Sequence, residues 1–200
     1  MIRRLFNLNT LYILIAIIAI GLLLIPRIIE SSHLQSKGIS YISSNIEDYY
    51  HTVFPQEGKV TIEIDLSDLE SNEGKVLFED SETKIYITKV THDDSEYNVT
   101  FRSSGSYDAG GATLVSGLEH ERNNNGLTSH FKAKAEAVYK GENYELSPSG
   151  SSGLHYRDGD RFGFYLLPPN QMKNIDLIEE SIIEVTITNL QVNLWVKKPK

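Results

Sequence analysis

The hydrophobic positions of this 200-residue chain begin with one continuous apolar run. Residues 11–25 read LYILIAIIAIGLLLI, and extension back to Leu5 adds only two asparagines and one threonine as polar residues. A helix rises about 1.5 Å per residue, so residues 5–25 cover roughly 32 Å, close to the ~30 Å hydrocarbon core of a bilayer. This pattern predicts a transmembrane helix over residues 5–26.

The flanking charges predict how that helix is oriented. Arg3 and Arg4 precede it, and acidic residues follow Arg27. By the positive-inside rule, residues 1–4 form a cytoplasmic tail and residues 27–200 lie outside the cell membrane in a single-pass topology. Two alternatives are a cleaved signal peptide and a buried core helix. We favour a retained signal-anchor, because the end of the run has no small-residue cleavage site and no other predicted helix could cover it.

Residues 27–58 form a second region, which we expect to be a linker. Its apolar residues recur at steps of three and four, which is the helical period, between Gly38 and Pro55. They are Ile39, Ile42, Ile46, Tyr49 and Val53. The spacing predicts a short amphipathic helix over residues 39–54, which either covers one end of the following domain or forms a stalk that dimerises.

From Val60 onward the period changes to two, which is typical of half-buried β-strands. Alternating segments occur at residues 60–66, 83–90, 97–102, 131–139 and 162–166. Turn-forming residues separate them, including a Ser147–Gly153 segment that we interpret as a loop. The pattern predicts a mainly β domain over residues 59–200, a single antiparallel β-sandwich of jelly-roll or immunoglobulin-like type.

The last alternating segment, residues 183–196, changes parity near Asn189. Such a change indicates a β-bulge or a bend between sheets, and we favour a bulge over two strands joined by a tight turn. Trp195, the only Trp, falls outside the apolar frame of this segment, and we expect a structural role for it.

Composition excludes several kinds of site. Without Cys the chain has no disulfide, thiolate nucleophile or Cys-ligated metal. Residues 27–200 hold 17 of the 19 Lys and Arg and all 27 Asp and Glu, a net charge of −10. Such an acidic region is a poor match for phosphate backbones, so we expect no nucleic-acid partner.

One segment, residues 155–162, reads HYRDGDRF and is our candidate ligand-binding site. Tyr156 and Arg157 are residue types that stack on or hydrogen-bond to a sugar or peptide. Asp158 and Asp160 flank a glycine and could meet calcium, but calcium needs six to eight oxygens, and we favour a plain Asp-Gly turn over a calcium site. We expect no metal and no cofactor.

Catalytic motifs are absent from the sequence. It contains no G-x-S-x-G, Walker A, G-x-G-x-x-G or H-E-x-x-H pattern, so we assign no catalytic residue. We favour a non-enzymatic, membrane-anchored module outside the cytoplasm that binds a protein or a cell-wall component. The alternatives are an envelope glycan hydrolase with an Asp/Glu pair and a homo-oligomerising surface protein.

Overall fold

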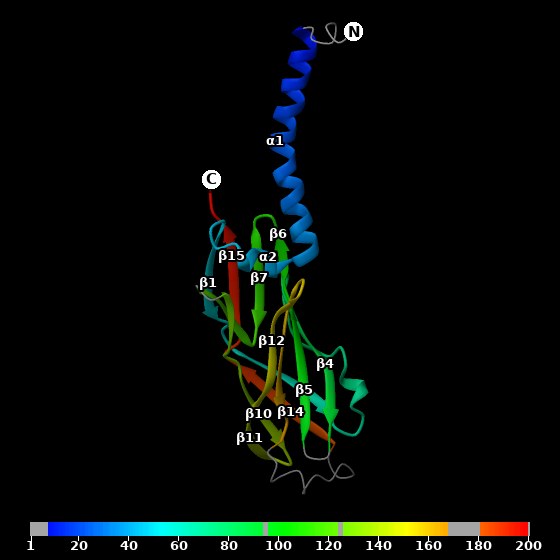
Figure 1. Cartoon of the computed structure of the whole chain (residues 1–200). Helices are drawn as coiled ribbons and strands as arrows, with labels where there is room; N and C mark the ends of the chain where they lie inside the picture. The colour runs from blue at the N-terminus through cyan, green and yellow to red at the C-terminus, as the bar shows by residue number, and fades with distance from the viewer. Residues whose placement is uncertain (1–7, 94–95, 124–125, 168–180, 200) are drawn as a thin grey trace.

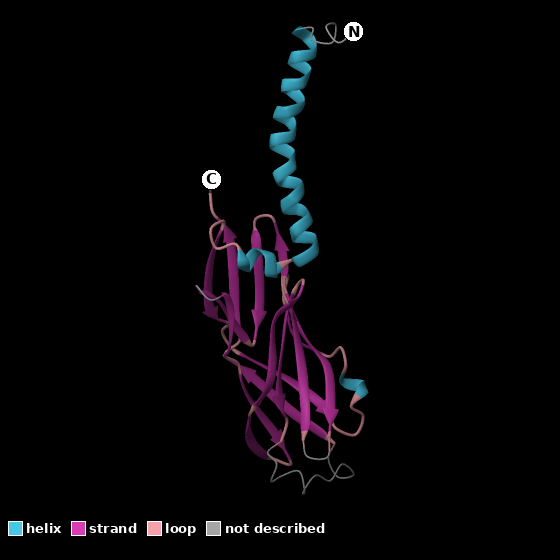
Figure 2. Ribbon diagram, viewed as in Figure 1, coloured by secondary structure: helices cyan, strands magenta, loops and turns pink. Residues whose placement is uncertain are grey.

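The computed structural model describes residues 8–93, 96–123, 126–167 and 181–199. It shows one long N-terminal helix that leads into an elongated, mainly β body (Figures 1 and 2). The mainly β, antiparallel fold and the N-terminal apolar helix are therefore confirmed. The predicted tail 1–4 and the first residues of the apolar segment lie outside the described residues.

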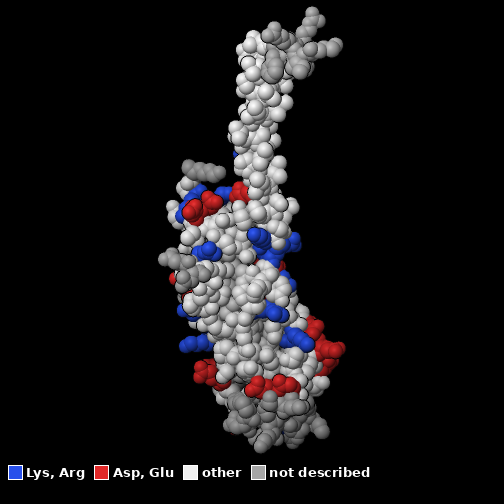
Figure 3. Space-filling model, viewed as in Figure 1, with Lys and Arg blue, Asp and Glu red and all other residues white. Residues whose placement is uncertain are grey.

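Helix α1, Leu8–Lys37, extends well beyond the predicted segment. It includes Pro26 and the first residues of the predicted linker, and Leu34 is its only buried residue among those described. Its apolar part is long enough to cross a membrane. Figure 3 shows that the charged residues on the viewed face lie on the β body and near its junction with α1, while most of the helix surface carries none.

The predicted helix over residues 39–54 is wrong in its second half. Helix α2 spans only Ile39–Ser44, and strand β1 follows at Tyr49–Pro55. The sequence YYHTVF in β1 is rich in aromatic and β-branched residues, which favour strands. These residues pair with β15 (Gln191–Lys197), the last strand of the chain, so the segment forms a strand although its apolar residues are spaced as in a helix.

The remaining strands lie between Lys59 and Lys197. They are β2 (Lys59–Asp65), β3 (Val76–Glu79), β4 (Lys84–His92), β5 (Tyr97–Ser104), β6 (Ser106–Asp108), β7 (Gly111–Ser116), β8 (Leu118–Asn123), β9 (Gly126–Phe131), β10 (Lys134–Tyr139), β11 (Glu142–Leu146), β12 (Pro148–Tyr156), β13 (Gly159–Tyr165), β14 (Ile182–Thr188) and β15 (Gln191–Lys197). A short 3-10 helix, η1 (Glu70–Asn72), precedes β3.

These strands form three sheets and one two-stranded ribbon. We call β1-β15-β7-β6 the anchor sheet, β11-β10-β14-β2 the first core sheet and β12-β13-β5-β4-β3 the second core sheet; β8 and β9 form the ribbon. Neighbouring strands in each are antiparallel. The choice between a jelly-roll and an immunoglobulin-like type stays a prediction.

The main hydrophobic core contains side chains from both core sheets. Ile64 and Val185 come from the first core sheet, and Phe101, Phe162 and Phe164 come from the second; all five are almost completely buried. The rings of Phe101 and Phe162 stack at 5.5 Å between centroids. The alternation that predicted these strands is therefore the pattern that fills this core.

The parity change at Asn189 marks a passage between sheets rather than a bulge. Strand β14 ends at Thr188 in the first core sheet, and β15 begins at Gln191 in the anchor sheet. Asn189 adopts a left-handed conformation with φ 57°. The favoured single bulged strand is wrong, and the bend between sheets is confirmed. Trp195 is buried on the inner side of β15.

Two connections between strands differ in kind. Lys140 and Gly141, with φ of 50° and 74°, join β10 to β11 in a tight turn. The Ser147–Gly153 segment is not a loop, because most of it lies in β12 and pairs with β13.

Candidate functional site

The hairpin of β12 and β13 carries all four predicted ligand-binding residues: Tyr156, Arg157, Asp158 and Asp160. The structure does not gather them in one place. Arg157 contacts the end of α1, Tyr156 and Asp158 lie beside Arg102, and Asp160 points into the interior. Their role in binding a ligand stays a prediction.

Arg157 fixes the hairpin to the junction of the two helices. Its guanidinium donates to the carbonyl of Gln35 at 3.0 Å, and its own carbonyl accepts from the amide of Ile39 at 2.8 Å. Gly38 joins the helices at φ 55°, and a Cβ there would lie 1.8 Å from the Arg157 carbonyl oxygen. Only glycine combines this conformation with such a close approach.

Apolar contacts extend the same junction. Leu34, Ile39 and Ile42 are buried with Leu114 and Trp195 in a second hydrophobic cluster, separate from the main core. Full burial of one such aliphatic side chain contributes roughly 1.5–3 kcal/mol. The cluster therefore holds α1 and α2 against the anchor sheet.

An ion pair between Lys197 and Glu30 closes the other side of the junction. The hydrogen bond to Glu30 raises the pKa of Lys197 above its usual value. Because Lys197 ends β15, this pair joins the helix to the last strand of the anchor sheet.

Asp158 forms a polar cluster on the outer face of the second core sheet. One carboxylate oxygen accepts from Arg102 Nη2 and the other from Ser104 Oγ, each at 2.6 Å. Burial acts to raise the pKa of Asp158, but these hydrogen bonds and the charge of Arg102 outweigh it, so the pKa is lowered. The Arg102 guanidinium also lies 4.1 Å from the ring centroid of Tyr156.

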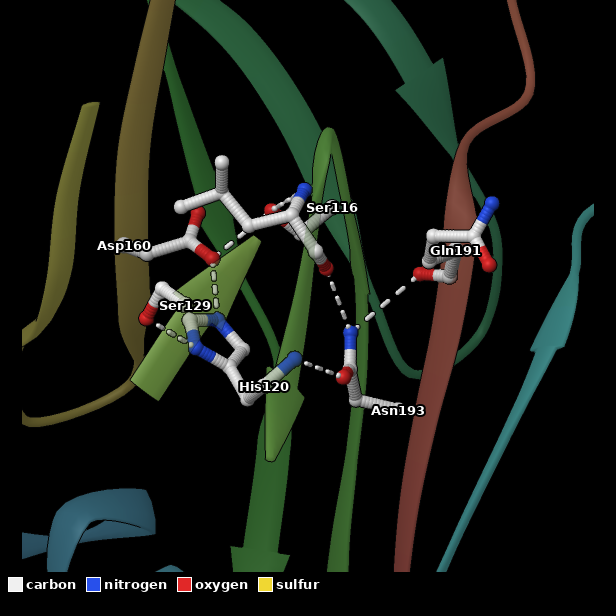
Figure 4. Close-up of polar contacts among 7 residues, drawn as sticks. Ser116, His120, Ser129, Asp160, Gln191 and Asn193 are labelled. Carbon is white, nitrogen blue, oxygen red and sulfur yellow. Dashed lines mark hydrogen bonds and ion pairs between the residues drawn. The ribbon is translucent and has the colours of Figure 1, made fainter. Parts of the chain in front are cut away.

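Asp160 anchors a buried network on the opposite side of the hairpin (Figure 4). Its Oδ2 accepts from Ser116 Oγ at 2.7 Å and lies 2.6 Å from His120 Nε2. His120 Nδ1 lies 2.8 Å from Ser129 Oγ. Asp160 and His120 are fully buried, and Asp160 Oδ1 has no hydrogen-bond partner among the described residues.

Asn193 extends this network to β15. Its Oδ1 accepts from the amide of His120, and its Nδ2 donates to the carbonyl of Leu118, each at 2.9 Å. These are the two bonds that a neighbouring strand would supply to β8. The buried Asn193 side chain therefore holds the ribbon on the anchor sheet.

The residues Ser129, His120 and Asp160 are of the types used in acyl-transfer triads. Here, however, the serine contacts Nδ1 and the aspartate contacts Nε2, the reverse of the usual arrangement. The cavity next to His120 has a volume of about 10 Å³, the space of a single water. In the described part of the chain these three side chains join strands, and the cavity beside His120 is too small for a substrate.

His51 lies at the same cavity and stacks on Trp195, with 4.7 Å between the ring centroids. Burial, together with the nearby His120, lowers the pKa of His51 below 6.5, although Glu119 and Glu121 act in the opposite direction. His51 Nε2 is buried without a hydrogen-bond partner among the described residues. The protonated form of this imidazole is therefore disfavoured next to the junction.

Sequence reasoning did not find the residues that organise this region. Arg102, Ser116 and Asn193 lie in separate strands, and only the folded topology brings them to the hairpin. His120 and His130 lie on opposite faces of the ribbon, one buried and one exposed. Among the described residues, no group of three or more His, Asp or Glu could hold a metal ion.

Comparison with known proteins adds no assignment to this geometry. No family model, curated protein or solved structure matches the chain.

Proposed function

We propose that this protein is a single-pass membrane protein whose β-sandwich module lies outside the cytoplasm and binds a protein partner or an envelope component. One observation carries the proposal: the apolar surface of α1 is exposed along most of the helix, yet its last turns are docked on the β body. A bilayer is the environment that covers such a surface.

The orientation follows from the charges at the two ends of the apolar run. Arg3 and Arg4 keep the N-terminus in the cytoplasm by the positive-inside rule. The acidic remainder of the chain is then translocated. Its β domain follows α1 without a flexible linker, because only Gly38 separates α1 from α2.

Asp158 and Asp160 do not supply the carboxyl pair that glycan hydrolysis would need. A glycosidase requires two carboxyl groups that converge across a cleft. Asp158 is bound to Arg102 and Ser104, whereas Asp160 is buried on the other side of the hairpin. These two groups therefore stabilise the fold and do not form such a pair.

The test combines fractionation, protease accessibility and crosslinking in intact cells of a bacterial host that produces the full chain. We expect the protein in the membrane fraction after alkaline carbonate washing, with its β domain digested by protease added outside. We also expect crosslinked adducts to a protein or to wall material. Recovery of the intact chain as a dissolved cytosolic protein contradicts the anchor, and the absence of any adduct contradicts the binding role.

A further inference from the structure

An open groove of about 250 Å³ lies on the outer face of the second core sheet. Polar residues and glycines supply most of its lining: Asn98, Thr100, Ser149, Gly150, Ser151, Ser152, Arg161, Phe162 and Gly163. It is separate from the buried His120 network and from the helix junction.

The groove exists because β12 pairs irregularly with β13. The register shifts between Pro148 and Gly150 and again between Ser152 and Tyr156. Gly163 in β13 leaves the bottom of the groove free of a side chain. A Cβ there would lie 2.7 Å from both the Val99 carbonyl oxygen and Ser149 Oγ. The backbone of β12 is thereby available at the groove edge.

Hydroxyl and amide groups line this space. Ser149 Oγ donates to Asn98 Oδ1 at 3.0 Å, which leaves the Asn98 amide nitrogen available as a donor. Ser152 Oγ is buried and has no hydrogen-bond partner among the described residues. An unpaired buried hydroxyl carries a desolvation cost that a polar ligand would recover.

Arg161 provides the charge of the groove. It is exposed, and it forms no ion pair with the described residues, unlike Arg102, which is bound to Asp158. Its guanidinium lies 5.6 Å from the ring centroid of Tyr156. On the side that Figure 3 shows, basic residues lie mainly over the middle of the β body and acidic residues mainly toward its ends, although the whole chain carries a net charge of −8.

We infer that the groove binds a hydroxyl-rich anionic chain, a saccharide or polyol that carries phosphate or carboxylate groups. The inference rests on the proposed function, whose binding partner it specifies by chemical class. Arg161 pairs with the anionic group through its planar donors, and Asn98, Thr100 and Ser152 hydrogen-bond to hydroxyls. An apolar peptide would leave these polar groups desolvated and unpaired.

The test uses the full chain in phosphatidylcholine nanodiscs and measures binding of three polymers. The probes are poly(glycerol phosphate), polygalacturonate and uncharged dextran. We expect saturable binding of at least one anionic polymer that weakens as salt rises, and at least tenfold weaker binding of dextran. Binding of only one anionic polymer identifies phosphate or carboxylate as the preferred group. Equal binding of all three polymers, or of none, overturns the inference.

Three variants test whether the groove is responsible. Arg161→Gln should weaken binding roughly tenfold, which is the loss of one charge-assisted contact. Arg122→Gln removes the same charge from an exposed site on β8 and should leave binding unchanged. Equal losses in both variants would show attraction to overall charge and overturn the groove site.

Ser152→Ala separates binding from folding. The variant removes a hydroxyl that has no partner among the described residues, so its thermal midpoint should not fall, while binding weakens severalfold. Unchanged binding in Ser152→Ala together with unchanged binding in Arg161→Gln also overturns the inference. Fractionation reports separately on the anchor, and a protein adduct in crosslinking supports the binding role even when all three polymers fail.

Discussion

The two ends of the β body are stabilised in different ways. The end formed by the two core sheets has a large, almost entirely apolar core in which aromatic rings meet. The end formed by the anchor sheet, α2 and the ribbon has a small apolar cluster and depends on the buried Asp160–His120 network. The first end can stabilise itself by burial, whereas the second requires a set of specific polar contacts and the helices.

Trp195 makes this comparison measurable. It is the only Trp and is buried at the anchor-sheet end, so its fluorescence reports on that end alone. Far-UV circular dichroism reports on the whole β body. Divergence between the two signals during denaturation therefore shows which end unfolds first.

The largest effect is expected from Phe164→Ala in the main core. Phe164 is fully buried and meets Phe131 and Phe162 edge-on. Loss of the ring should cost about 4 kcal/mol, and both signals should shift together because the common core is weakened. Phe164→Leu is the control and should cost less than about 2 kcal/mol. A loss confined to Trp195 fluorescence would contradict the assignment of this core.

His120→Ala should have the next largest effect and should separate the two signals. It leaves the buried Asp160 carboxylate with only Ser116 as a partner among the described residues. We expect a cost of about 3 kcal/mol and an earlier transition in Trp195 fluorescence than in circular dichroism. His130→Ala on the exposed face of the same ribbon should change stability by less than about 0.5 kcal/mol. Coincident transitions in His120→Ala would mean that the two ends unfold as one unit.

Gly38→Ala tests the junction. The new Cβ would collide with the Arg157 carbonyl, and the positive φ of 55° is unfavourable for alanine. We expect a cost of about 2 kcal/mol that appears as faster tryptic cleavage after Lys37. Gly21→Ala lies in α1 with only Ile25 Cδ1 nearby, at 3.8 Å, and should leave cleavage unchanged. Similar cleavage of both variants would argue against a fixed junction.

The smallest effect concerns pH and His51. Because its pKa is lowered in the folded protein, His51 binds a proton more readily when the chain is unfolded. Its contribution to stability is therefore complete above pH 6.5 and is lost as the pH falls from 6.5 toward the folded pKa. His51→Phe keeps a ring on Trp195 and should flatten the pH dependence of the Trp195 transition in that range. An unchanged slope would show that His51 does not titrate there.

Alternation predicted the central strands because their inward residues fill the main core. Periodicity failed at β1, where the three-four spacing of apolar residues predicted a helix. The aromatic and β-branched residues at 49–54 favour the strand that forms there. Periodicity also failed at β12, because serines and glycines are typical of loops. Antiparallel pairing with β13 makes this segment a strand despite its low β-propensity.

The buried network was beyond sequence reasoning for a different reason. His120 and Asp160 are forty residues apart, and their contact depends on how the ribbon crosses the β13 strand. Arg161 and Ser152 meet at the groove because they face each other in the pairing of β13 with β12. Periodicity identifies which face a residue occupies, but it does not specify which strands become neighbours.

The single-glycine connection at Gly38 has a mechanical consequence. A flexible tether would let a domain reorient freely, whereas here the last turns of α1 are clamped on the strands that follow. If α1 spans a bilayer as proposed, the tilt and rotation of this helix determine the orientation of the whole β body relative to the membrane. A change in bilayer thickness would then alter the tilt of α1 and, with it, the direction in which the groove faces.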